Sequence, residues 1–565
     1  MSKRILIVGG VAGGASAAAR ARRIDEQAEI VMFERGPHVS FSNCGLPYHL
    51  SGMIENSEDL VLMNPEVFKA QYNIDARVNS EVVKINRESN SITVKNVLTG
   101  EETEEKYDKL VLAPGAKAIM PRSIEGIDSE NVFKVKNVVD IEALTAFVEV
   151  NQVEDIAVVG GGFIGVEVAE NFKLAGKNVT LIEAIDQIMS PFDYDMAQLL
   201  HKEMDDKGVE LILEDGVKAI HSDKVVLNSG KEVKAGAVVM AIGVLPETDL
   251  AKDAGLEIGS TGAIKVNQHY QTSDKDIYAV GDVIEVFNSI TREVTKLPLA
   301  GPAQRQARAA ADHMYGIPAN NKGVIGSSVV QVFDLTAAAT GLNEKAAAKA
   351  NIPYDFVYII PNDMVGLMPE AKQLHFKLIY EVPTGRILGA QAIGQGNADK
   401  RIDVIATMIT MGGTLEDLKE LELCYAPPFG TAKDVVNHAA LVALNVLYGR
   451  FNQVKVTEVR ELVEKGAFIV DVREEDEFAE GHIVNAVNIP LSQLRDRMDE
   501  IPKDQPVYLH CRSSQRSYNA LLALQGNGYE NVFNISGSYL GISCYEYFND
   551  KKLGREKIVT EYNFN

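Results

Sequence analysis

A strand, a glycine-rich loop and a helix follow one another twice in this sequence, and this repeat restricts the fold more than any other feature. The first copy runs from an apolar segment at residues 5–8 into the loop GGVAGG at residues 9–14 and then into an alanine-rich stretch. The second copy, IAVVGGGFIGVEVAE, places its loop at residues 160–165. In such a unit, backbone N–H groups and the positive end of the helix can face a pyrophosphate. Two copies therefore predict two bound dinucleotides.

An acidic residue follows each loop at about the 20-residue distance that is typical of nucleotide-binding units. Glu34 lies in EIVMFER, and Glu183 ends the corresponding strand of the second copy. A carboxylate in this place can bind ribose hydroxyls. Glu183 would repel a 2′-phosphate and residues 184–186 carry no cation to hold one, so NADH is expected rather than NADPH. In the first copy Val11 replaces the usual second glycine, which leaves a plain structural turn as the alternative.

Length and composition indicate a soluble protein of several domains. The 565 residues predict about four domains, and 46% hydrophobic with 24% charged residues is ordinary for a globular chain. The net charge of -23 disfavours nucleic acid and anionic membranes as partners. The apolar run at residues 5–8 is too short for a signal peptide or a membrane span. Four cysteines without a CxxC pair predict free thiols and no metal module, so we expect a cytoplasmic protein.

Three further segments are expected to be strands that end in glycine turns. Residues 107–116 (YDKLVLAPGA) and 238–248 (VVMAIGVLPET) are points where the chain can cross between nucleotide domains. Residues 277–283 (IYAVGDV) place Asp282 where a carboxylate can reach a ribityl hydroxyl. The order of the two glycine loops, the crossover strands and this GD motif resembles the flavoprotein disulfide reductases that bind two dinucleotides. The resemblance implies FAD in the first unit and NAD(P)H in the second.

A single cysteine, Cys44 in SFSNCGLPY, stands where glutathione-reductase-like members carry a CxxxxC pair, because residues 45–49 contain no second cysteine. Ala12 occupies the place of a histidine found in peroxidase and oxidase relatives. Coenzyme A disulfide reductases are similar around Cys44 and at CYAPPFGTAKD, residues 424–434, and the resemblance covers roughly residues 1–447. Cys44 precedes an expected helix, whose N-terminus would stabilise a thiolate. A buried structural cysteine is the alternative.

The resemblance implies a mechanism as well. Cys44 would attack the sulfur–sulfur bond of the substrate and release one half of the substrate. The other half would remain on Cys44 as a mixed disulfide or persulfide. Hydride from NADH, passed through FAD, would then expel this second half. Tyr425 matches an active-site tyrosine that reaches the site from the partner subunit and can protonate the leaving thiolate. An interface tyrosine without catalytic duty is the alternative. The family's second tyrosine is missing, since the aligned stretch is LMPEA at residues 367–371, and this loss argues against efficient reduction of coenzyme A disulfide.

The C-terminal part has motifs of its own. VDVREEDEF, GHI and NIPL precede VYLHCRSSQRS, which places Cys511 at the end of an expected strand, where ligand sites of parallel sheets lie. These motifs resemble rhodanese, the sulfurtransferase fold. The loop from Cys511 to Arg516 would direct backbone N–H groups and the Arg516 guanidinium at a persulfide anion on Cys511. Cys424 and Cys544 lack such a setting and are expected to be structural.

Three groups of binding residues follow from the motifs and the resemblance. For FAD they are Gly9, Gly10, Ala12, Gly13, Gly14, Glu34, Arg35, Asn43, Ala113, Gly115, Gly281 and Asp282. For NADH they are Gly160, Gly162, Phe163, Ile164, Gly165, Glu183 and Gly243. For coenzyme A they are Ser16, Arg20, Arg23, Ser40, Asn43 and Lys433, with a solvated helix arginine as the alternative for Arg20.

We predict an α/β fold with two Rossmann-like dinucleotide-binding domains, an α+β dimerisation domain and a C-terminal α/β rhodanese domain. The expected FAD-binding domain comprises residues 1–115 and 245–321, and the NADH-binding domain residues 116–244. A dimerisation domain at residues 322–445 predicts a homodimer. A short linker at residues 446–456 would lead to the rhodanese domain at residues 457–565.

The fusion of the two parts favours one substrate class. A domain that collects sulfane sulfur suits an enzyme that reduces persulfides better than one that only splits coenzyme A disulfide. We therefore expect FAD-dependent reduction of persulfide or polysulfide sulfur by NADH, with Cys511 loading sulfur, Cys44 attacking it, and coenzyme A or another small thiol as carrier. Three rivals remain: a coenzyme A disulfide reductase, a sulfurtransferase with a redox-sensing flavoprotein module, and an NADH oxidase or peroxidase, which Ala12 disfavours.

Overall fold

A computed structural model describes residues 3–319 and 321–564 of the chain. It divides into two compact units, one of residues 1–184 and 215–324 and the other of residues 185–214 and 325–565. Residues 185–214, which were expected in the NADH-binding domain, thus group with the second unit.

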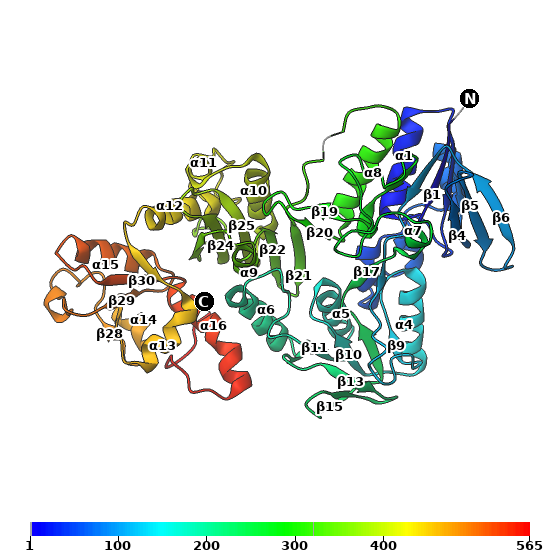
Figure 1. Cartoon of the computed structure of the whole chain (residues 1–565). Coiled ribbons are helices and arrows are strands. Elements are labelled where there is room, and N and C mark those ends of the chain that lie inside the picture. Colours follow the sequence, from blue (N-terminus) through cyan, green and yellow to red (C-terminus); the bar gives the residue numbers. More distant parts are fainter. Residues whose placement is uncertain (1–2, 320, 565) are drawn as a thin grey trace. The chain divides into compact units, whose positions relative to one another are not determined.

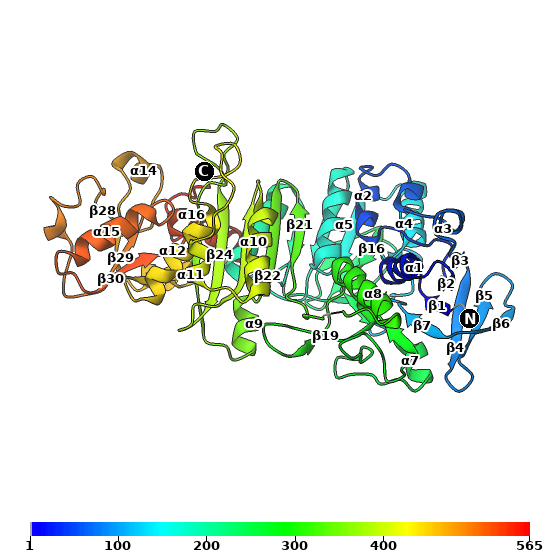
Figure 2. The ribbon, with the colours of Figure 1, turned by 90° about the horizontal axis from the view of Figure 1, so that it is seen from above.

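The first nucleotide-binding domain is built on a parallel sheet with the strand order β18-β7-β1-β2-β3. Its central strand is buried on both faces, with Ile5, Leu6 and Ile7 fully buried, as expected for a parallel strand covered on two sides. The helices α1 and α8 lie side by side against it (Figure 1, Figure 2). The elements of this domain are β1 (Arg4–Val8), α1 (Ala12–Ile24), β2 (Glu29–Phe33), α2 (Leu46–Leu50), α3 (Pro65–Tyr72), β3 (Asp75–Arg77), β4 (Ser80–Asn86), β5 (Ser91–Asn96), β6 (Glu102–Lys106), β7 (Lys109–Leu112), α7 (Asp249–Asp253), β18 (Ile277–Ala279) and α8 (Ala300–Met314).

The second nucleotide-binding domain repeats this arrangement. Its parallel sheet pairs β11 with β10, β10 with β16, and β16 with β9. A short antiparallel pair, β8 with β17, joins the two crossover segments, with Ala116 opposite Pro246. The elements are β8 (Ala116–Ala118), β9 (Val132–Phe133), α4 (Val138–Val150), β10 (Asp155–Val159), α5 (Phe163–Leu174), β11 (Asn178–Ile182), β13 (Val217–Ile220), β14 (Lys224–Leu227), β15 (Glu232–Lys234), β16 (Ala237–Met240) and β17 (Val244–Pro246).

The second unit contains an antiparallel sheet with the order β21-β22-β25-β24-β23, on which α10 and α12 pack. The strands β24 and β25 are buried along almost their whole length, because helices and other elements cover both faces. The elements are α6 (Tyr194–Asp206), β12 (Glu210–Ile212), β21 (Ser328–Val332), β22 (Leu335–Gly341), α9 (Glu344–Lys349), β23 (Tyr354–Ile359), β24 (Leu374–Glu381), β25 (Ile387–Gly394), α10 (Ala398–Met411), α11 (Leu415–Lys419) and α12 (Val435–Leu447).

The C-terminal domain has a parallel sheet with the order β26-β30-β29-β27-β28, coloured orange to red in Figure 1. Its strand β26 (Asn452–Val454) lies inside the segment that was expected to be a linker, because Asn452 to Val454 pair with β30. The remaining elements are α13 (Val459–Glu464), β27 (Phe468–Asp471), α14 (Glu475–Glu480), β28 (Val487–Asn488), β29 (Val507–His510), α15 (Gln515–Gln525), β30 (Val532–Ile535) and α16 (Ser538–Leu553).

This C-terminal domain is packed firmly within the second unit. Gln453 donates a hydrogen bond to the carbonyl oxygen of Phe356 on β23 at 2.7 Å, and Ser536 donates to the carbonyl oxygen of Tyr358 at 3.2 Å. A Cβ on Gly537 would lie 2.7 Å from the Tyr358 ring, so the backbone of Gly537 approaches this ring where a larger residue would clash. The C-terminal domain is therefore docked on the antiparallel sheet and is not tethered by a loose linker.

Candidate active site

The two glycine loops contact their acidic residues in the same way. The N–H of Gly10 donates to Glu34 Oε2 at 2.9 Å, and the N–H of Gly161 donates to Glu183 Oε2 at 2.6 Å. Both carboxylates thus lie at the loop, where they can also face the ribose of a nucleotide laid across it.

Close approach inside each loop leaves room only for glycine. A Cβ on Gly14 would lie 1.8 Å from the carbonyl oxygen of Gly9, and a Cβ on Gly165 would lie 1.8 Å from that of Gly160. Gly162 faces open space at the start of α5. Among the described residues no side chain caps α1 or α5, and neither helix has an acid in its first turn. The free N–H groups and the open loops fit the pyrophosphates of two dinucleotides.

The other residues predicted for the nucleotides lie around these loops. Arg35 forms an ion pair with Glu247 at 2.8 Å, so its charge is already partly matched. Asp282 lies in a short turn after β18, 3.9 Å from Lys136 Nζ. The rest occupy loop and first-turn positions: Ala12 and Gly13 in α1, Asn43 before α2, Ala113 and Gly115 after β7, Phe163 and Ile164 in α5, Gly243 after β16 and Gly281 beside Asp282.

Cys44 is solvent-accessible in a turn that precedes the short helix α2. Partial burial raises the pKa of the Cys44 thiol, the carboxylates of Glu167 and Asp282 raise it further, and Lys136 opposes them. The helix that follows Cys44, α2, has five residues, and the two carboxylates that act on the sulfur come from distant segments. Stabilisation of the thiolate by this helix stays a prediction.

Glu167 and Tyr48 form a pair beside Cys44 that the sequence analysis missed. The helix α2 packs on α5, and Ser51 Oγ donates to Asn171 Oδ1 at 2.6 Å. The Tyr48 hydroxyl donates a hydrogen bond to the Glu167 carboxylate. Burial raises the pKa of Glu167 to about 7, and burial together with Glu167 raises the pKa of Tyr48 to about 12. A carboxylate in the apolar stretch FIGVEVAE was the one signal that could have revealed this pair.

Of the residues predicted for coenzyme A, Ser16, Arg20 and Arg23 share α1. The guanidinium of Arg20 donates from Nε to Asp312 Oδ1 at 2.6 Å, so it is neither a solvated arginine nor an unmatched charge. Arg23 is exposed, with its guanidinium 5.7 Å from the centre of the Tyr72 ring.

Ser40 lies next to the first glycine loop. Its backbone has a positive φ of 50°, and its N–H donates to the carbonyl oxygen of Gly10 at 2.8 Å. The loop around Ser40 and Cys44 therefore begins directly at the loop expected to hold the flavin nucleotide.

Two exposed segments of the second unit carry the other predicted residues. Tyr425 has 51% of its surface exposed, and Lys433 is exposed on the same segment before α12. Leu367, in the stretch that lacks the family's second tyrosine, is 90% exposed. Cys424 is exposed as well, whereas Cys544 is buried.

Cys511 directly follows β29 and is surrounded by polar groups. The residue is buried, its N–H donates to Ser538 Oγ at 3.2 Å, and Ser517 Oγ donates to Cys511 Sγ at 3.6 Å. Ser514 ends the loop with a positive φ of 77° before α15 begins at Gln515. The polypeptide therefore wraps around the sulfur atom and presents the first turn of α15 beside it.

Arg516 lies between Cys511 and an acidic residue that the sequence analysis did not select. Its guanidinium donates to both oxygens of Glu477 at 2.6 and 2.7 Å, and it also hydrogen-bonds to the Cys511 sulfur. The Arg516 guanidinium lowers the pKa of Glu477. Glu477 lies in VREEDEF, where the run of acidic residues gave no sign of which one would turn inward.

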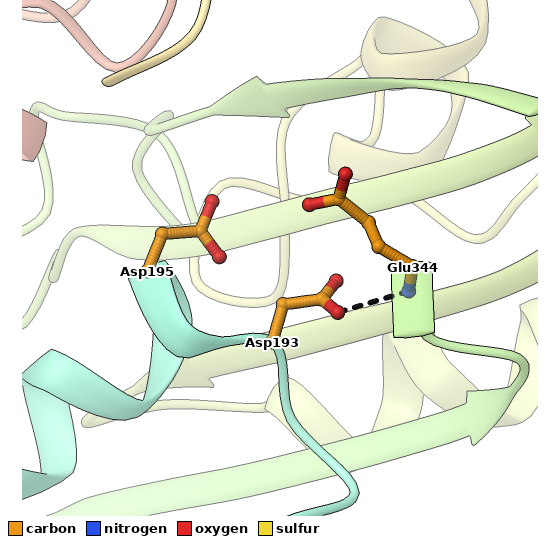
Figure 3. Close-up of side chains that lie close together, drawn as sticks. All are labelled: Asp193, Asp195 and Glu344. Atoms are coloured by element: carbon orange, nitrogen blue, oxygen red, sulfur yellow. Dashed lines mark hydrogen bonds between the residues drawn. The ribbon is translucent and has the colours of Figure 1, made fainter. Parts of the chain in front are cut away.

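Figure 3 shows three carboxylates turned toward one another in the second unit, those of Asp193, Asp195 and Glu344, with the N–H of Glu344 donating to Asp193 Oδ1 at 2.9 Å. The ammonium group of the fully buried Lys377 forms ion pairs with all three carboxylates. Its Nζ lies 2.8 Å from Asp195 Oδ2, 2.6 Å from Glu344 Oε1 and 3.2 Å from Asp193 Oδ2. Burial alone would lower the pKa of Lys377, but the three carboxylates raise it above its ordinary value. The cation held by this acidic group is therefore the lysine ammonium itself.

The fold and these sites are typical of an oxidoreductase with two dinucleotide units, here with an accessible cysteine in the first unit and a second domain with a thiol loop. Family comparisons agree: the pyridine nucleotide-disulphide oxidoreductase model matches residues 3–307, its dimerisation domain residues 327–435, and the rhodanese-like domain residues 455–543. The chain belongs to the pyridine nucleotide-disulphide oxidoreductase family. The predicted fold class is thus confirmed, and the family's cofactors are FAD and NADH.

Two curated relatives are coenzyme A disulfide reductases. The protein of Staphylococcus haemolyticus (strain JCSC1435) is 32% identical over 439 residues, which cover 77% of this chain and 98% of the relative. That of Staphylococcus aureus (strain JH9) is 33% identical over 435 residues, with the same coverage.

Two solved structures are similar along nearly the whole chain. Reduced CoADR-RHD from Bacillus anthracis is 46% identical with a TM-score of 0.93, covering 96% of this chain and 98% of that one. The NAD-dependent persulfide reductase from A. fulgidus is 35% identical with a TM-score of 0.91, covering 96% and 100%. The resemblance to coenzyme A disulfide reductases with a C-terminal rhodanese domain is therefore confirmed.

Among residues 3–319 and 321–564, no helix is both long and apolar enough to cross a membrane.

Proposed function

We propose that this protein reduces the sulfane sulfur of a small thiol persulfide, such as coenzyme A persulfide, with NADH. The observation that carries the proposal is the presence in one chain of two thiols in different settings. Cys44 is accessible in the first nucleotide-binding domain, and Cys511 is buried with Arg516 and Ser517 against its sulfur. The first setting suits attack on a substrate, and the second suits storage of an anionic persulfide.

The chemistry balances as one two-electron reduction. The Cys44 thiolate attacks the outer sulfur of the persulfide, the substrate S–S bond breaks, and a new S–S bond forms on Cys44. The departing thiolate takes a proton, which we assign to the Tyr425 hydroxyl. FAD, held by the first glycine loop, would supply two electrons from NADH, with which the S–S bond on Cys44 would break to give the Cys44 thiolate and hydrogen sulfide. Overall, NADH, one proton and the persulfide give NAD⁺, the thiol and hydrogen sulfide.

The residues of this chain have distinct duties in this scheme. Lys136 favours the charged form of Cys44, while Glu167 and Asp282 oppose it. These three groups therefore act on the pKa of the Cys44 thiol in opposite directions. Ser16, Arg23, Ser40, Asn43 and Lys433 are proposed to hold coenzyme A. Arg516 and the loop that begins at Cys511 are proposed to load sulfane sulfur and deliver it to the thiol carrier.

We propose that the protein is a cytoplasmic homodimer. The match to a dimerisation domain supports two copies. Large apolar side chains exposed on the segments around Leu367, Tyr425 and Phe429 are suited to cover by a second chain. Four free cysteines suit a reducing compartment.

A comparison of two substrates tests the proposal. NADH oxidation and sulfide release are followed with coenzyme A persulfide and with coenzyme A disulfide, for the wild type, Cys44→Ser and Cys511→Ser. We expect the persulfide to be the better substrate, Cys44→Ser to abolish turnover, and Cys511→Ser to leave turnover of preformed persulfide largely intact. NADH oxidation by the persulfide without sulfide release would refute it.

Reduction of coenzyme A disulfide is the second candidate function. It is favoured by the two relatives at 32 and 33% identity, which are named for that activity. It would be shown by faster NADH oxidation with the disulfide than with the persulfide.

A further inference from the structure

Arg401 is one of the most deeply buried charged residues of the second unit, with 1% of its surface exposed. It lies on α10, and its Nη2 donates to two acceptors: Asp434 Oδ2 at 3.1 Å and the carbonyl oxygen of Asp363 at 2.7 Å. Its Nη1 donates to the carbonyl oxygen of Asn397 at 3.4 Å. A guanidinium can remain away from water only when such partners compensate its charge. One nitrogen atom therefore joins two segments that are far apart in the sequence.

The first of these segments is the loop of residues 363–372. Its two ends are closed on each other, because the N–H of Asp363 donates to the carbonyl oxygen of Lys372 at 2.8 Å and the N–H of Lys372 donates to Asp363 Oδ1 at 2.8 Å. Leu367, at 90% exposure, lies inside the loop. Arg401 thus holds the loop at its base, whereas the residues between the two ends reach into solvent.

The second segment, residues 422–433, ends at the other partner of Arg401. Asp434 is 5% exposed and accepts a hydrogen bond from the N–H of Val436 at the start of α12. A Cβ on Gly430 would lie 3.5 Å from both Arg401 Nη2 and Asp434 Oδ2, so this segment passes directly over the ion pair. Tyr425 and Lys433 are exposed on it.

We infer that Arg401 is a positioning residue for the substrate site, which fixes the segments 363–372 and 422–433 relative to each other and so presents Tyr425 and Lys433 in one geometry. The inference rests on the proposed function, which assigns those two residues to the sulfur substrate. Arginine suits this duty because the two N–H groups on Nη2 are held in the plane of the guanidinium and so fix the directions of both acceptors, whereas the three donors of a lysine ammonium rotate freely. Displacement of a reacting group by about 1 Å can reduce a rate by about 100-fold, so a remote buried residue can control turnover.

Four variants of the FAD-loaded enzyme test this inference. Arg401→Met removes the charge, Arg401→Lys keeps the charge without the fork, and the double variant Arg401→Met/Asp434→Leu removes both charges together. A buried pair replaced by apolar residues regains stability more readily than a single charge left alone. Arg386→Met is the control, because Arg386 lies on the same unit and forms its ion pair with Glu381, at 3.2 Å, outside both segments.

Three readouts are taken for each variant: the melting temperature, hydrogen–deuterium exchange of peptides covering the two segments, and the rates of the two half-reactions. We expect Arg401→Met and the double variant to raise exchange in both segments and to lower sulfide release from coenzyme A persulfide by at least about tenfold. Reduction of the bound flavin by NADH should stay within about twofold of wild type, because it does not use these segments. The double variant should regain the wild-type melting temperature but not the wild-type rate of sulfide release. Arg401→Lys should regain neither the wild-type protection from exchange nor the wild-type rate of sulfide release.

Exchange and sulfide release at wild-type levels in the double variant would overturn the inference. The same two results in Arg401→Lys would also overturn it. An equal loss in flavin reduction would also overturn it, since that would show a general structural role. If the wild type itself releases no sulfide from the persulfide, the proposed function fails. In that case the exchange data alone decide whether Arg401 holds the two segments.

Discussion

The guanidinium of Arg516 forms a bidentate ion pair with the carboxylate of Glu477, at 2.6 and 2.7 Å, and also hydrogen-bonds to the sulfur of Cys511. The helix α14 thus supplies the acid that orients an arginine on α15 toward the thiol. A planar fork held on one side by two of its five N–H groups keeps another N–H group directed at the sulfur.

The pair predicts a loss of sulfur transfer when either partner is changed. Charge-assisted hydrogen bonds are worth about 1.5–3 kcal/mol, so Arg516→Met should lower thiosulfate-to-cyanide transfer about 10- to 100-fold. Glu477→Gln should lower it about tenfold, because the fork loses its orientation. Reduction of the flavin by NADH serves as the control and should not change. Transfer within twofold of wild type for Glu477→Gln would show that Arg516 needs no partner.

The same pair predicts a pH dependence. The pKa of Glu477 is lowered in the folded protein, so the stability it contributes is present above the ordinary range of a glutamate and is lost as pH falls through the lowered value. Sulfur transfer should therefore be insensitive to this group at neutral pH and fall only in acid. An unchanged acid midpoint of sulfur transfer in Glu477→Gln would contradict this assignment, because glutamine does not titrate.

Replacement of Lys377 by methionine should strongly destabilise the second unit. It would leave the buried carboxylates of Asp193 and Asp195 without their cation, at a cost of about 3–5 kcal/mol in the free energy of unfolding. Lys345→Met is the matched control, since Lys345 is exposed on α9 and should change stability by less than about 1 kcal/mol. Urea denaturation at pH 7 measures both, and similar values for the two variants would contradict the prediction.

The effect of Lys377 also has a definite pH range. Because its pKa is raised in the folded protein, its contribution is complete below the ordinary lysine value and is lost only as pH rises through the raised value. Burial raises the pKa of Asp193, so in Lys377→Met that carboxyl can protonate and the defect should shrink as pH falls. Urea denaturation midpoints of wild type and Lys377→Met, measured from pH 5 to 8, test this trend. A difference between the two proteins that does not shrink as pH falls would contradict it.

Cys44 should respond in opposite directions to its charged neighbours. Glu167→Gln removes a carboxylate that raises the pKa of Cys44, so the midpoint of thiol alkylation should fall. Lys136→Met removes the opposing cation, so the midpoint should rise. Since the pKa of Glu167 is about 7, wild-type alkylation should show an additional inflection near neutral pH that is absent in Glu167→Gln. Movement of both variants in the same direction would rule out a charge effect.

Glu183 should set the choice between NADH and NADPH. Glu183→Gln keeps an oxygen for the N–H of Gly161 but removes the charge, so kcat/KM for NADPH should rise relative to NADH. Glu183→Ala also loses the loop hydrogen bond and should lower kcat/KM for NADH by about tenfold. Glu149→Ala, on the exposed side of α4, is the control and should alter neither value. A preference for NADPH in the wild type would refute the assignment.

The fold was predictable because its signals are local. The glycine loops, the buried apolar strands and the CRSSQRS loop each depend on residues that are close in sequence, and both nucleotide units appear where these patterns indicated. Boundaries were less predictable, since Asn452 to Val454 join a sheet through pairing with β30, about 80 residues away, and nothing in their own sequence indicates that partner.

The sequence by itself determined the class of this protein, its two nucleotide units, its rhodanese domain and the two cysteines to which we assign the chemistry. Only the tertiary structure decided which charges surround those cysteines. Glu167, Lys136 and Asp282 reach Cys44 from three separate segments, and Glu477 reaches Arg516 from another helix. Arg401 likewise joins two segments about 70 residues apart through one nitrogen atom. Electrostatic interactions act through space, so their sign and strength at a thiol depend on distances that a linear pattern does not contain.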